Sequence, residues 1–384
     1  MSNIKSNDKQ YIANTYNRFD IQIDSLNNGI ATSGEKEYID FGTGIGVTAF
    51  GAGDDIWIDA VCAQAKKLPH ASNLYYTEPC VKLATLLCER TGMKKVFFGN
   101  SGAEANECAI KCARKYSSDK YGDGRATVIT LKNSFHGRTL LTLSATGQDV
   151  FHKHFGPFPE GFRYVEANNI DDLKANIDDT VCAFMFECVQ GEGGVIALNP
   201  EYLKAAEKLC RERDILLICD EVQTGNGRTG SLYAYEQFGI TPDIVSTAKG
   251  LGGGLPIGAC IMGEAVENTL SAGSHGSTFG GNPICSAGAY TIISRLNKAY
   301  LSDIKARAKY LWDKLSTLDN VKSISGLGFM IGLEVDDNKK FIADCEAAGL
   351  LVLSAKSKVR LLPPLNVSYE TIDKAISILA AAGK

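Results

Sequence analysis

Residues 215–260 read ILLICDEVQTGNGRTGSLYAYEQFGITPDIVSTAKGLGGGLPIGAC and contain two short apolar runs that each end in charge. Asp220 and Glu221 close the first run, and Lys249 closes the second. Roughly 30 residues separate Asp220 from Lys249, which is the length of a strand, a crossover and a return strand. If both runs are parallel strands of one sheet, the carboxylate and the amine emerge at the same edge, where open α/β sheets bind ligands.

Composition limits the classes of partner. The chain has 384 residues and a formal net charge of −4. This length allows a large core plus a smaller second domain, whereas the acidic balance argues against nucleic acid or an anionic membrane bound by bulk charge. The polar amino terminus and the lack of an apolar run near roughly 18 residues predict a soluble, cytoplasmic protein without a membrane segment. Twelve cysteines form no CxxC pair, so we expect buried, reduced thiols.

The pattern along the chain predicts an arm and two domains. Residues 1–45 are turn-rich and should form an arm with an edge hairpin that packs with the small domain. In residues 46–284, helical patterns such as 79–91 and 199–213 alternate with short apolar runs at 95–98, 126–131, 182–189, 215–222 and 244–248. Such runs indicate a mostly parallel sheet covered by helices on both faces. Helices and short strands mixed in residues 285–384 predict a small α+β domain.

The stretch from Asn100 to Glu104 follows a predicted strand and opens a helix. Ser101 and Glu104 have the spacing of a capping box, which has a purely structural explanation. Gly102 and Ala103, however, leave the first backbone amides of the helix open, and such amides bind phosphate. Because the two interpretations use the same donors, the sequence leaves both open.

Residues 225–230 match the pattern GxGxxG after a predicted strand. A dinucleotide site needs the first glycine directly at the strand end. Gln223 and Thr224 intervene here, and Asp220 and Glu221 would bring negative charge to the phosphates. We therefore interpret this segment as a turn.

Two further segments carry side chains suited to chemistry. Phe135 and Arg138 follow the strand predicted at 126–131, where a ring could stack on a ligand and a guanidinium could bind a carboxylate. Lys249 lies between an apolar strand and a glycine-rich loop, a setting that desolvates an amine and makes it nucleophilic. His152 and His154 have no further ligand at metal spacing, so we expect no metal site.

A phosphate-binding turn, an aromatic ring, a buried aspartate and a nucleophilic lysine together describe a site for pyridoxal 5′-phosphate. The turn would hold the phosphate, Lys249 would form the Schiff base, and Asp220 would face the pyridine nitrogen. A carboxylate about 4 Å from a protonated nitrogen contributes a few kcal/mol at moderate dielectric. That interaction keeps the ring cationic and able to accept electrons.

The ordered motifs of the chain resemble those of class III, subgroup II aminotransferases, which are fold type I pyridoxal-phosphate enzymes. The motifs are FFGNSGAEANE (97–107), SFHGRT (134–139), ECVQGEGG (187–194), LICDEVQTGNGRTG (217–230), STAKGLGGGLPIGA (246–259) and HGSTFGGNP (275–283). With TYNRF (15–19) and VRLLPPL (359–365) they cover nearly the whole chain. The resemblance implies a large domain with a mostly parallel central sheet and a smaller α+β domain.

The resemblance also implies roles for individual residues. Gly102 and Ala103 should bind the cofactor phosphate with Thr278 of a second subunit, which implies a homodimer. Phe135 should stack on the ring, Asp220 should pair with its nitrogen, and Gln223 with its phenolic oxygen. The complete implied sets are Ser101, Gly102, Ala103, Phe135, Asp220, Glu221, Val222, Gln223, Lys249 and Thr278 for the cofactor, and Tyr16, Arg138, Glu192, Ser277 and Arg360 for the substrates.

Within the family the chain is most similar to members that act on N2-acetylornithine. The implied ping-pong reaction moves its terminal amino group to 2-oxoglutarate and yields N-acetylglutamate 5-semialdehyde and glutamate, a step of arginine biosynthesis. Arg360 should bind the α-carboxylate of glutamate, and Glu192 should neutralise Arg360 when the other substrate is bound. An unpaired arginine would otherwise penalise a donor with no carboxylate at that place.

Other functions remain open from the sequence. Ornithine, succinylornithine or 4-aminobutyrate could be the amino donor, because the cofactor motifs are shared. A mutase or epimerase of the same fold would have no need for both Arg360 and Glu192. A binding protein without catalysis would have no reason to keep Lys249.

The sequence departs from the family at two places. Cys188 stands where the family usually has proline, and residues 51–55 replace an expected histidine-containing loop near the dimer interface.

Overall fold

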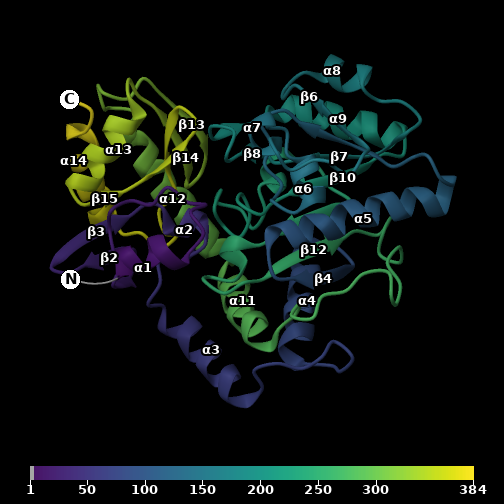
Figure 1. The fold of residues 1–384 in the computed structure, drawn as a ribbon, viewed down its shortest axis with the longest axis horizontal. Coiled ribbons are helices and arrows are strands. Elements are labelled where there is room, and N and C mark those ends of the chain that lie inside the picture. Colours follow the sequence, from purple (N-terminus) through teal and green to yellow (C-terminus); the bar gives the residue numbers. More distant parts are fainter. Residues whose placement is uncertain (1–3) are drawn as a thin grey trace.

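The computed structural model describes residues 4–384, and its centre is a seven-stranded sheet (Figure 1). The strand order is β4 (Lys95–Gly99), β12 (Gly258–Met262), β11 (Ile244–Thr247), β10 (Leu216–Asp220), β7 (Val181–Phe186), β5 (Thr127–Leu131) and β6 (Phe162–Val165). β12 runs antiparallel to both of its neighbours, β11 and β4, and the other pairs are parallel. The prediction of an α/β fold with a mostly parallel sheet is therefore confirmed.

The register of this sheet explains why the opening stretch of sequence matters. Asp220 is the last residue of β10 and lies opposite Ser246 of β11. Lys249 begins a short 3₁₀ turn, η1 (Lys249–Leu251), just after β11. Since the two strands are parallel, the carboxylate and the amine leave the sheet at the same edge, as the spacing predicted.

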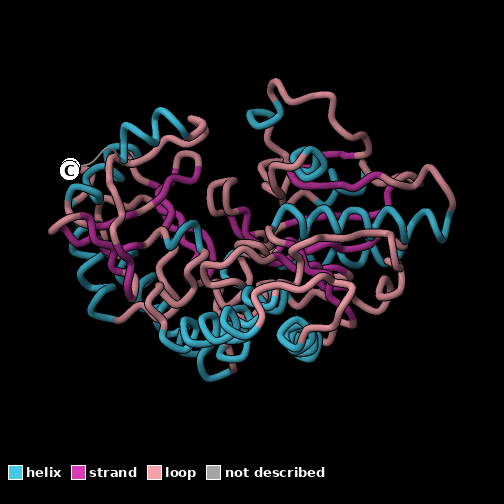
Figure 2. The backbone as a smooth tube through the Cα atoms, turned by 60° about the horizontal axis from the view of Figure 1, so that its bottom comes forward, coloured by secondary structure: helices cyan, strands magenta, loops and turns pink. Residues whose placement is uncertain are grey.

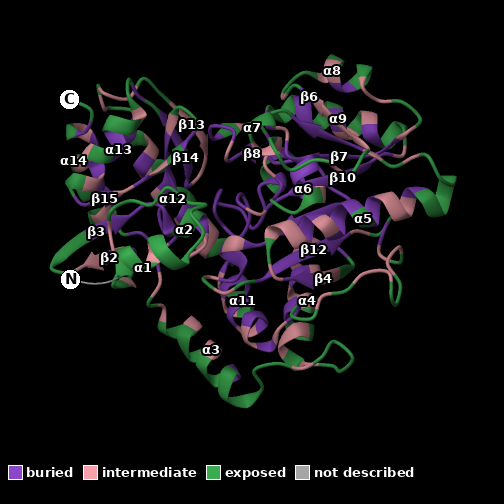
Figure 3. Ribbon diagram, viewed as in Figure 1, coloured by how far each residue is buried: buried purple, intermediate pink, exposed green. Residues whose placement is uncertain are grey.

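Helices bury both faces of the sheet, so the inner strands β7, β10, β11 and β12 are buried along their whole length without alternation (Figure 3). On one face, α5 (Gly102–Tyr121) packs across the sheet. On the other face lie α4 (Glu78–Thr91) and α9 (Pro200–Glu212), each with a buried apolar stripe. α11 (Pro283–Arg295) packs against α4 and against α3 (Asp55–Lys67). Short helices α6 (Leu140–Ala145), α7 (Asp149–His152), α8 (Ile170–Ala175) and α10 (Tyr235–Phe238) occupy the connections.

A second group of strands forms a smaller unit beside the large sheet (Figure 2). Its sheet has the order β13 (Ser323–Leu327), β14 (Met330–Glu334), β17 (Lys358–Leu361) and β16 (Leu353–Ala355). The helices of this part are α12 (Lys298–Leu315), α13 (Asn338–Ala347) and α14 (Tyr369–Ala381). This mixture of short strands and helices agrees with the α+β pattern expected from the sequence.

The amino-terminal segment joins the smaller unit through a sheet of its own. After α1 (Ile4–Tyr11), the strands β1 (Ser25–Asn27), β2 (Ile30–Ser33) and β3 (Lys36–Asp40) form an antiparallel meander. β3 then pairs in parallel with β15 (Leu350–Leu351). A single distorted turn, α2 (Thr43–Gly46), follows, and β8 (Val189–Gln190) pairs with β9 (Ile196–Ala197) near the central sheet.

The structure contains elements that the sequence pattern did not predict. α3 was not predicted, and Gln64 is its one buried residue. Residues 51–55, where the sequence departs from the family, lead into this helix. The Asp54 carboxylate accepts the Trp57 N–H at 2.9 Å and forms an ion pair with both Nη groups of Arg295 at 2.7 Å. Within residues 4–384, no helix is long and apolar enough to span a membrane.

The GxGxxG segment is a buried turn, as predicted. No helix begins directly at its glycines, so it lacks the geometry of a dinucleotide site. Arg228 in this turn is fully buried and donates to the carbonyl oxygens of Phe329 and Pro363. The turn therefore fastens the large sheet to the smaller unit.

Candidate active site

A cavity of about 470 Å³ lies at the carboxyl edge of the central sheet. Ten of the residues predicted from the sequence line it: Ser101, Gly102, Ala103, Phe135, Arg138, Glu192, Asp220, Val222, Gln223 and Lys249. They come from the start of α5, from the loops after β5 and β8, and from the ends of β10 and β11. Side chains far apart in sequence thus meet at one edge of the sheet.

The start of α5 combines a helix cap with open amides. Ser101 Oγ accepts the Glu104 N–H at 3.1 Å, and the Glu104 carboxylate binds the Asn100 N–H. The amides of Gly102 and Ala103 precede the first intrahelical hydrogen bond, which Ala105 donates to the Ser101 carbonyl at 3.1 Å. A Cβ on Gly102 would lie 2.6 Å from Val222 Cγ1. Helix capping and anion binding therefore use different N–H donors. Glycine at position 102 allows the start of α5 to lie against Val222.

Asp220 is a buried carboxylate with its geometry fixed on every side. Its Oδ2 accepts hydrogen bonds from Asn106 Nδ2 and from His136 Nδ1, both at 2.8 Å. Its Oδ1 accepts the Val222 N–H at 3.0 Å, and Asn106 also donates to the His136 carbonyl at 2.7 Å. An ionised Asp220 has no proton to donate, so Nδ1 of His136 is the donor in this bond. The cavity floor therefore carries a carboxyl group that is rigidly held.

Sequence reasoning missed Asn106 and His136 as functional residues. Asn106 lies one helical turn after Gly102 on the buried face of α5. Residues four apart lie on the same face of a helix, so the spacing from Gly102 could have placed Asn106 beside the cofactor site.

Lys249 is a buried amine in an unusual backbone conformation. Its φ is +45°, a left-handed value that costs free energy in residues other than glycine and is common at functional sites. Burial lowers the pKa of Lys249, and the Glu192 carboxylate offsets part of that shift. A larger neutral fraction at neutral pH makes the amine a better nucleophile and base.

Phe135 and Arg138 lie on the loop after β5, beside Phe151 of α7. The Arg138 guanidinium carbon is 5.3 Å from the centre of the Phe135 ring and 4.0 Å from that of Phe151. Stacking of this kind orients a guanidinium while its edge remains able to bind a carboxylate. Phe151 had not been singled out in the sequence.

Arg360 reaches the site from β17 of the smaller unit. Its Nη1 donates to Glu192 Oε1 at 2.5 Å and to Gln223 Oε1 at 3.2 Å. The Arg360 side chain is 3% exposed and that of Glu192 is 28% exposed. Burial alone would raise the pKa of Glu192, but the Arg360 charge outweighs it and the pKa is lowered. The predicted arginine–glutamate pair is therefore formed, and Arg360 Nε is buried without a partner.

Besides Arg360, four predicted residues lie outside the cavity lining. Ser277 and Thr278 line a second hollow, of about 830 Å³, which is joined to the first through a 3.2 Å hydrogen bond from Asn100 Nδ2 to Ser277 Oγ. Tyr16 is exposed, with Arg18 over its ring. Glu221 faces the core, where it accepts the Thr224 hydroxyl and the Tyr235 N–H.

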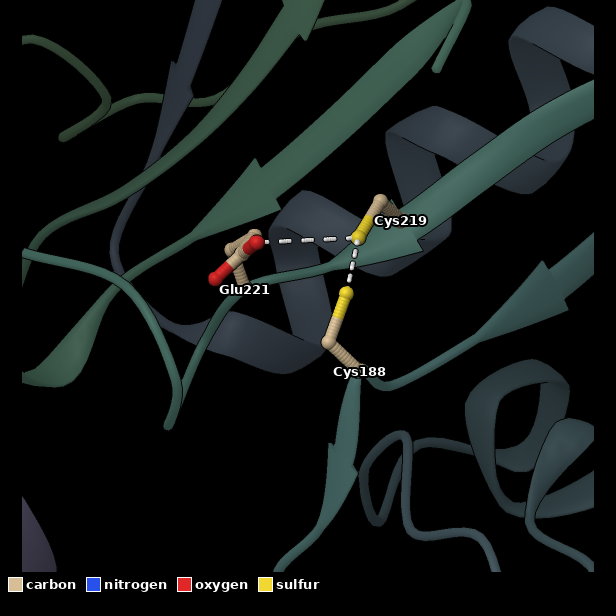
Figure 4. Close-up of side chains that lie close together, drawn as sticks. All are labelled: Cys188, Cys219 and Glu221. Carbon is tan, nitrogen blue, oxygen red and sulfur yellow. Dashed lines mark hydrogen bonds between the residues drawn. The ribbon is translucent and has the colours of Figure 1, made fainter. Parts of the chain in front are cut away.

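Cys188, the departure from the family pattern, belongs to a buried cluster under the site (Figure 4). Its Sγ lies 3.7 Å from Cys219 Sγ, which in turn lies 3.7 Å from Glu221 Oε1. The three groups are close enough to share a metal ion. However, burial raises the pKa of both thiols, and both Glu221 oxygens already accept hydrogen bonds. We interpret the cluster as hydrogen-bonded, protonated thiols.

Comparisons with known proteins agree with this geometry. The sequence profile of the family described as Aminotransferase class-III matches residues 11–382. The chain is 50% identical over 384 residues to the acetylornithine aminotransferase of Haemophilus ducreyi, covering 98% of this chain and 97% of the relative. It is 46% identical over 381 residues to that of Caldanaerobacter subterraneus subsp. tengcongensis, covering 97% of each.

Two solved structures share the fold at 31% identity. The ornithine aminotransferase from Toxoplasma gondii ME49 is similar with a TM-score of 0.94, covering 98% of this chain and 93% of the other. The N-acetylornithine aminotransferase from Stenotrophomonas maltophilia K279a is similar with a TM-score of 0.85, covering 98% and 97%.

Proposed function

The chain belongs to the class III aminotransferases, and from that premise we propose that it moves the terminal amino group of N2-acetylornithine to 2-oxoglutarate with pyridoxal 5′-phosphate as cofactor. Relatives at 42–50% identity that carry the name acetylornithine aminotransferase support this choice of donor. One structural observation carries the reaction type: the buried amine of Lys249 lies in the same cavity as the fixed carboxylate of Asp220. The expected products are N-acetylglutamate 5-semialdehyde and glutamate.

The residues of the cavity fit the cofactor. The amides of Gly102 and Ala103 would hold its phosphate, in a cradle that a Cβ on Gly102 would fill. Asp220 would pair with the ring nitrogen, and Phe135 would cover the ring. The amine of Lys249 would bind the aldehyde carbon. When bound, the cofactor supplies an electron sink for the negative charge that develops on the substrate carbon.

The chain's own residues perform the remaining steps. Asn106 and His136 keep the Asp220 carboxyl group in place. Lys249, whose pKa burial lowers, would take the proton from the donor carbon that bears the amino group, and in the half-reaction with 2-oxoglutarate it would give a proton to the carbon that receives the amino group. Arg138 would hold the substrate end that lies away from the reacting carbon.

Arg360 and Glu192 would let one cavity accept two different substrates in turn. With the amino donor bound, Glu192 neutralises Arg360, as in the present ion pair. With 2-oxoglutarate or glutamate bound, the α-carboxylate would take the place of Glu192 on Arg360. The partial exposure of Glu192 supports this exchange, since a side chain at the rim can turn away into water.

We further propose a cytoplasmic homodimer in which Thr278 of one chain completes the phosphate site of the other. Thr278 is exposed and belongs to the second hollow, and Ser277 beside it bonds to Asn100 at the cavity rim. Tyr16 and Ser277 would contact substrate in that assembly. The division into an arm (1–45), a large domain (46–284) and a small domain (285–384) is likewise a proposal.

A panel of amino donors tests the substrate. The ratio kcat/KM is measured for N2-acetylornithine, ornithine, succinylornithine and 4-aminobutyrate, each with 2-oxoglutarate as acceptor. We expect N2-acetylornithine to give the highest value. The assignment is wrong if ornithine, the donor named for the Toxoplasma relative, or another amine leads.

A further inference from the structure

Glu187 lines the cavity, although the proposed reaction gives it no part. It follows the last residue of β7, in the middle of the central sheet, and it is 6% exposed. Its Oε2 accepts the Phe135 N–H at 3.1 Å, and its Oε1 accepts the Gly191 N–H at 3.2 Å. Each oxygen of this one carboxyl group therefore holds a different loop.

These two loops carry the groups proposed to bind the two ends of a substrate. The first loop, residues 132–139, carries Arg138, and the second, residues 191–194, carries Glu192. The loops also touch each other, because a Cβ on Gly193 would lie 2.6 Å from the Asn133 carbonyl oxygen. A small change in either loop would therefore alter the distance between the two binding places.

We propose that Glu187 is a positioning residue that fixes the separation of these two loops, and through it the spacing between the substrate-binding groups of Arg138 and the Arg360–Glu192 pair. The inference rests on the proposed function only for the identity of the substrates. The hydrogen bonds to both loops exist whatever the substrate is.

The chemistry of the side chain supports this role. A carboxylate can accept hydrogen bonds with both oxygens, whereas an amide of the same shape has one acceptor and one donor. Burial raises the pKa of Glu187 to about 7, with the nearby Asp220 charge adding to the rise and His136 opposing it. A buried carboxyl group is costly unless its hydrogen bonds compensate. Its two accepted N–H groups offset part of that cost.

Hydrogen exchange of backbone amides tests the inference in Glu187→Gln. Exchange is followed by mass spectrometry in segments 133–138 and 190–194 of the cofactor-free and cofactor-loaded protein. We expect at least one segment to exchange about 10-fold faster, since one N–H loses its acceptor. β10, which Glu187 does not hold, should keep its exchange rate. KM should rise for both substrates more than kcat falls, because binding at both ends is misaligned.

Two further variants complete the design. Glu187→Asp keeps the carboxyl group but has a shorter side chain, so it should also lose one of the two hydrogen bonds and loosen a loop. It replaces the glutamine variant in the experiment if that variant does not fold. Glu236→Gln is the matched control, because Glu236 accepts a backbone N–H from Tyr233 away from the cavity. Unchanged exchange in both segments, or an equal rise in β10, would overturn the inference. Because exchange needs no substrate, a wild-type protein that transfers no amino group, together with loosened loops in the variant, would refute the proposed function alone.

Discussion

Glu192→Gln should impair the two halves of the reaction unequally. In the unliganded protein the Arg360 side chain is almost wholly buried, and its charge is neutralised by Glu192 at 2.5 Å. Loss of one partner from a buried ion pair costs about 3–5 kcal/mol. Because the Glu192 side chain is 28% exposed, water can reach the pair and reduce this cost. We therefore expect a cost of about 2 kcal/mol, which corresponds to a factor of roughly 30 in an equilibrium constant.

The direction of the effect depends on the substrate. With the amino donor bound, Arg360 lacks a counter-charge just as it does in the free variant, whereas the α-carboxylate of 2-oxoglutarate supplies one. The ratio of kcat/KM for the amino donor to kcat/KM for 2-oxoglutarate should therefore fall about 30-fold relative to the wild type. Single-turnover measurements of each half-reaction give the two kcat/KM values separately. Glu166→Gln, a change in an exposed ion pair with Lys132, is the control. Equal losses in both half-reactions would refute the assigned exchange.

Three other variants test the remaining parts of the site. Lys249→Ala should abolish amino transfer while the wild-type protein purifies yellow, and a colourless wild type that cannot be reconstituted with pyridoxal phosphate would contradict the cofactor assignment. Asn106→Ala removes a 2.8 Å hydrogen bond to Asp220; since bonds to charged groups contribute about 1.5–3 kcal/mol, the Kd for the cofactor in equilibrium dialysis should rise at least about 10-fold. Burial raises the pKa of Glu221 from 4.5 to about 7, so this carboxyl group stabilises the fold below about pH 4.5 and that contribution is lost as pH rises through 7. Glu221→Gln should flatten the dependence of Tm on pH across this window, and an unchanged slope would contradict the shift.

The sequence was sufficient where strand geometry determines position. Asp220 and Lys249 could be brought together from spacing alone, because parallel strands in register deliver their carboxyl ends to one edge. Strand geometry also explains why Glu221, which was expected in the cofactor site, lies outside the cavity. Neighbouring residues at a strand end point to opposite sides, so Asp220 lines the cavity while Glu221 turns into the core.

Other features could not be predicted because they depend on contacts between distant segments. A polar residue such as Asn106 on a helix is ordinarily solvated, and its role appears only when β10 brings Asp220 next to it. β12 was missed because its apolar run follows directly on a glycine-rich loop, and its antiparallel direction is set by pairing with β4 and β11. α3, in which Gln64 is the one buried residue, was not predicted either.

The three carboxylates that line the cavity differ in how firmly they are held, and this difference determines which one can yield to a substrate. Asp220 is almost fully buried and accepts from a helix side chain, an imidazole and a backbone amide. Glu187 accepts from two backbone amides of separate loops. Glu192 is partly exposed and is held chiefly by the Arg360 guanidinium. An incoming carboxylate can replace Glu192 on that guanidinium without leaving a buried group unpaired, since Glu192 can turn to water. Displacing either of the other two would orphan buried N–H groups, so the hydrogen-bond geometry selects Glu192 as the mobile carboxylate.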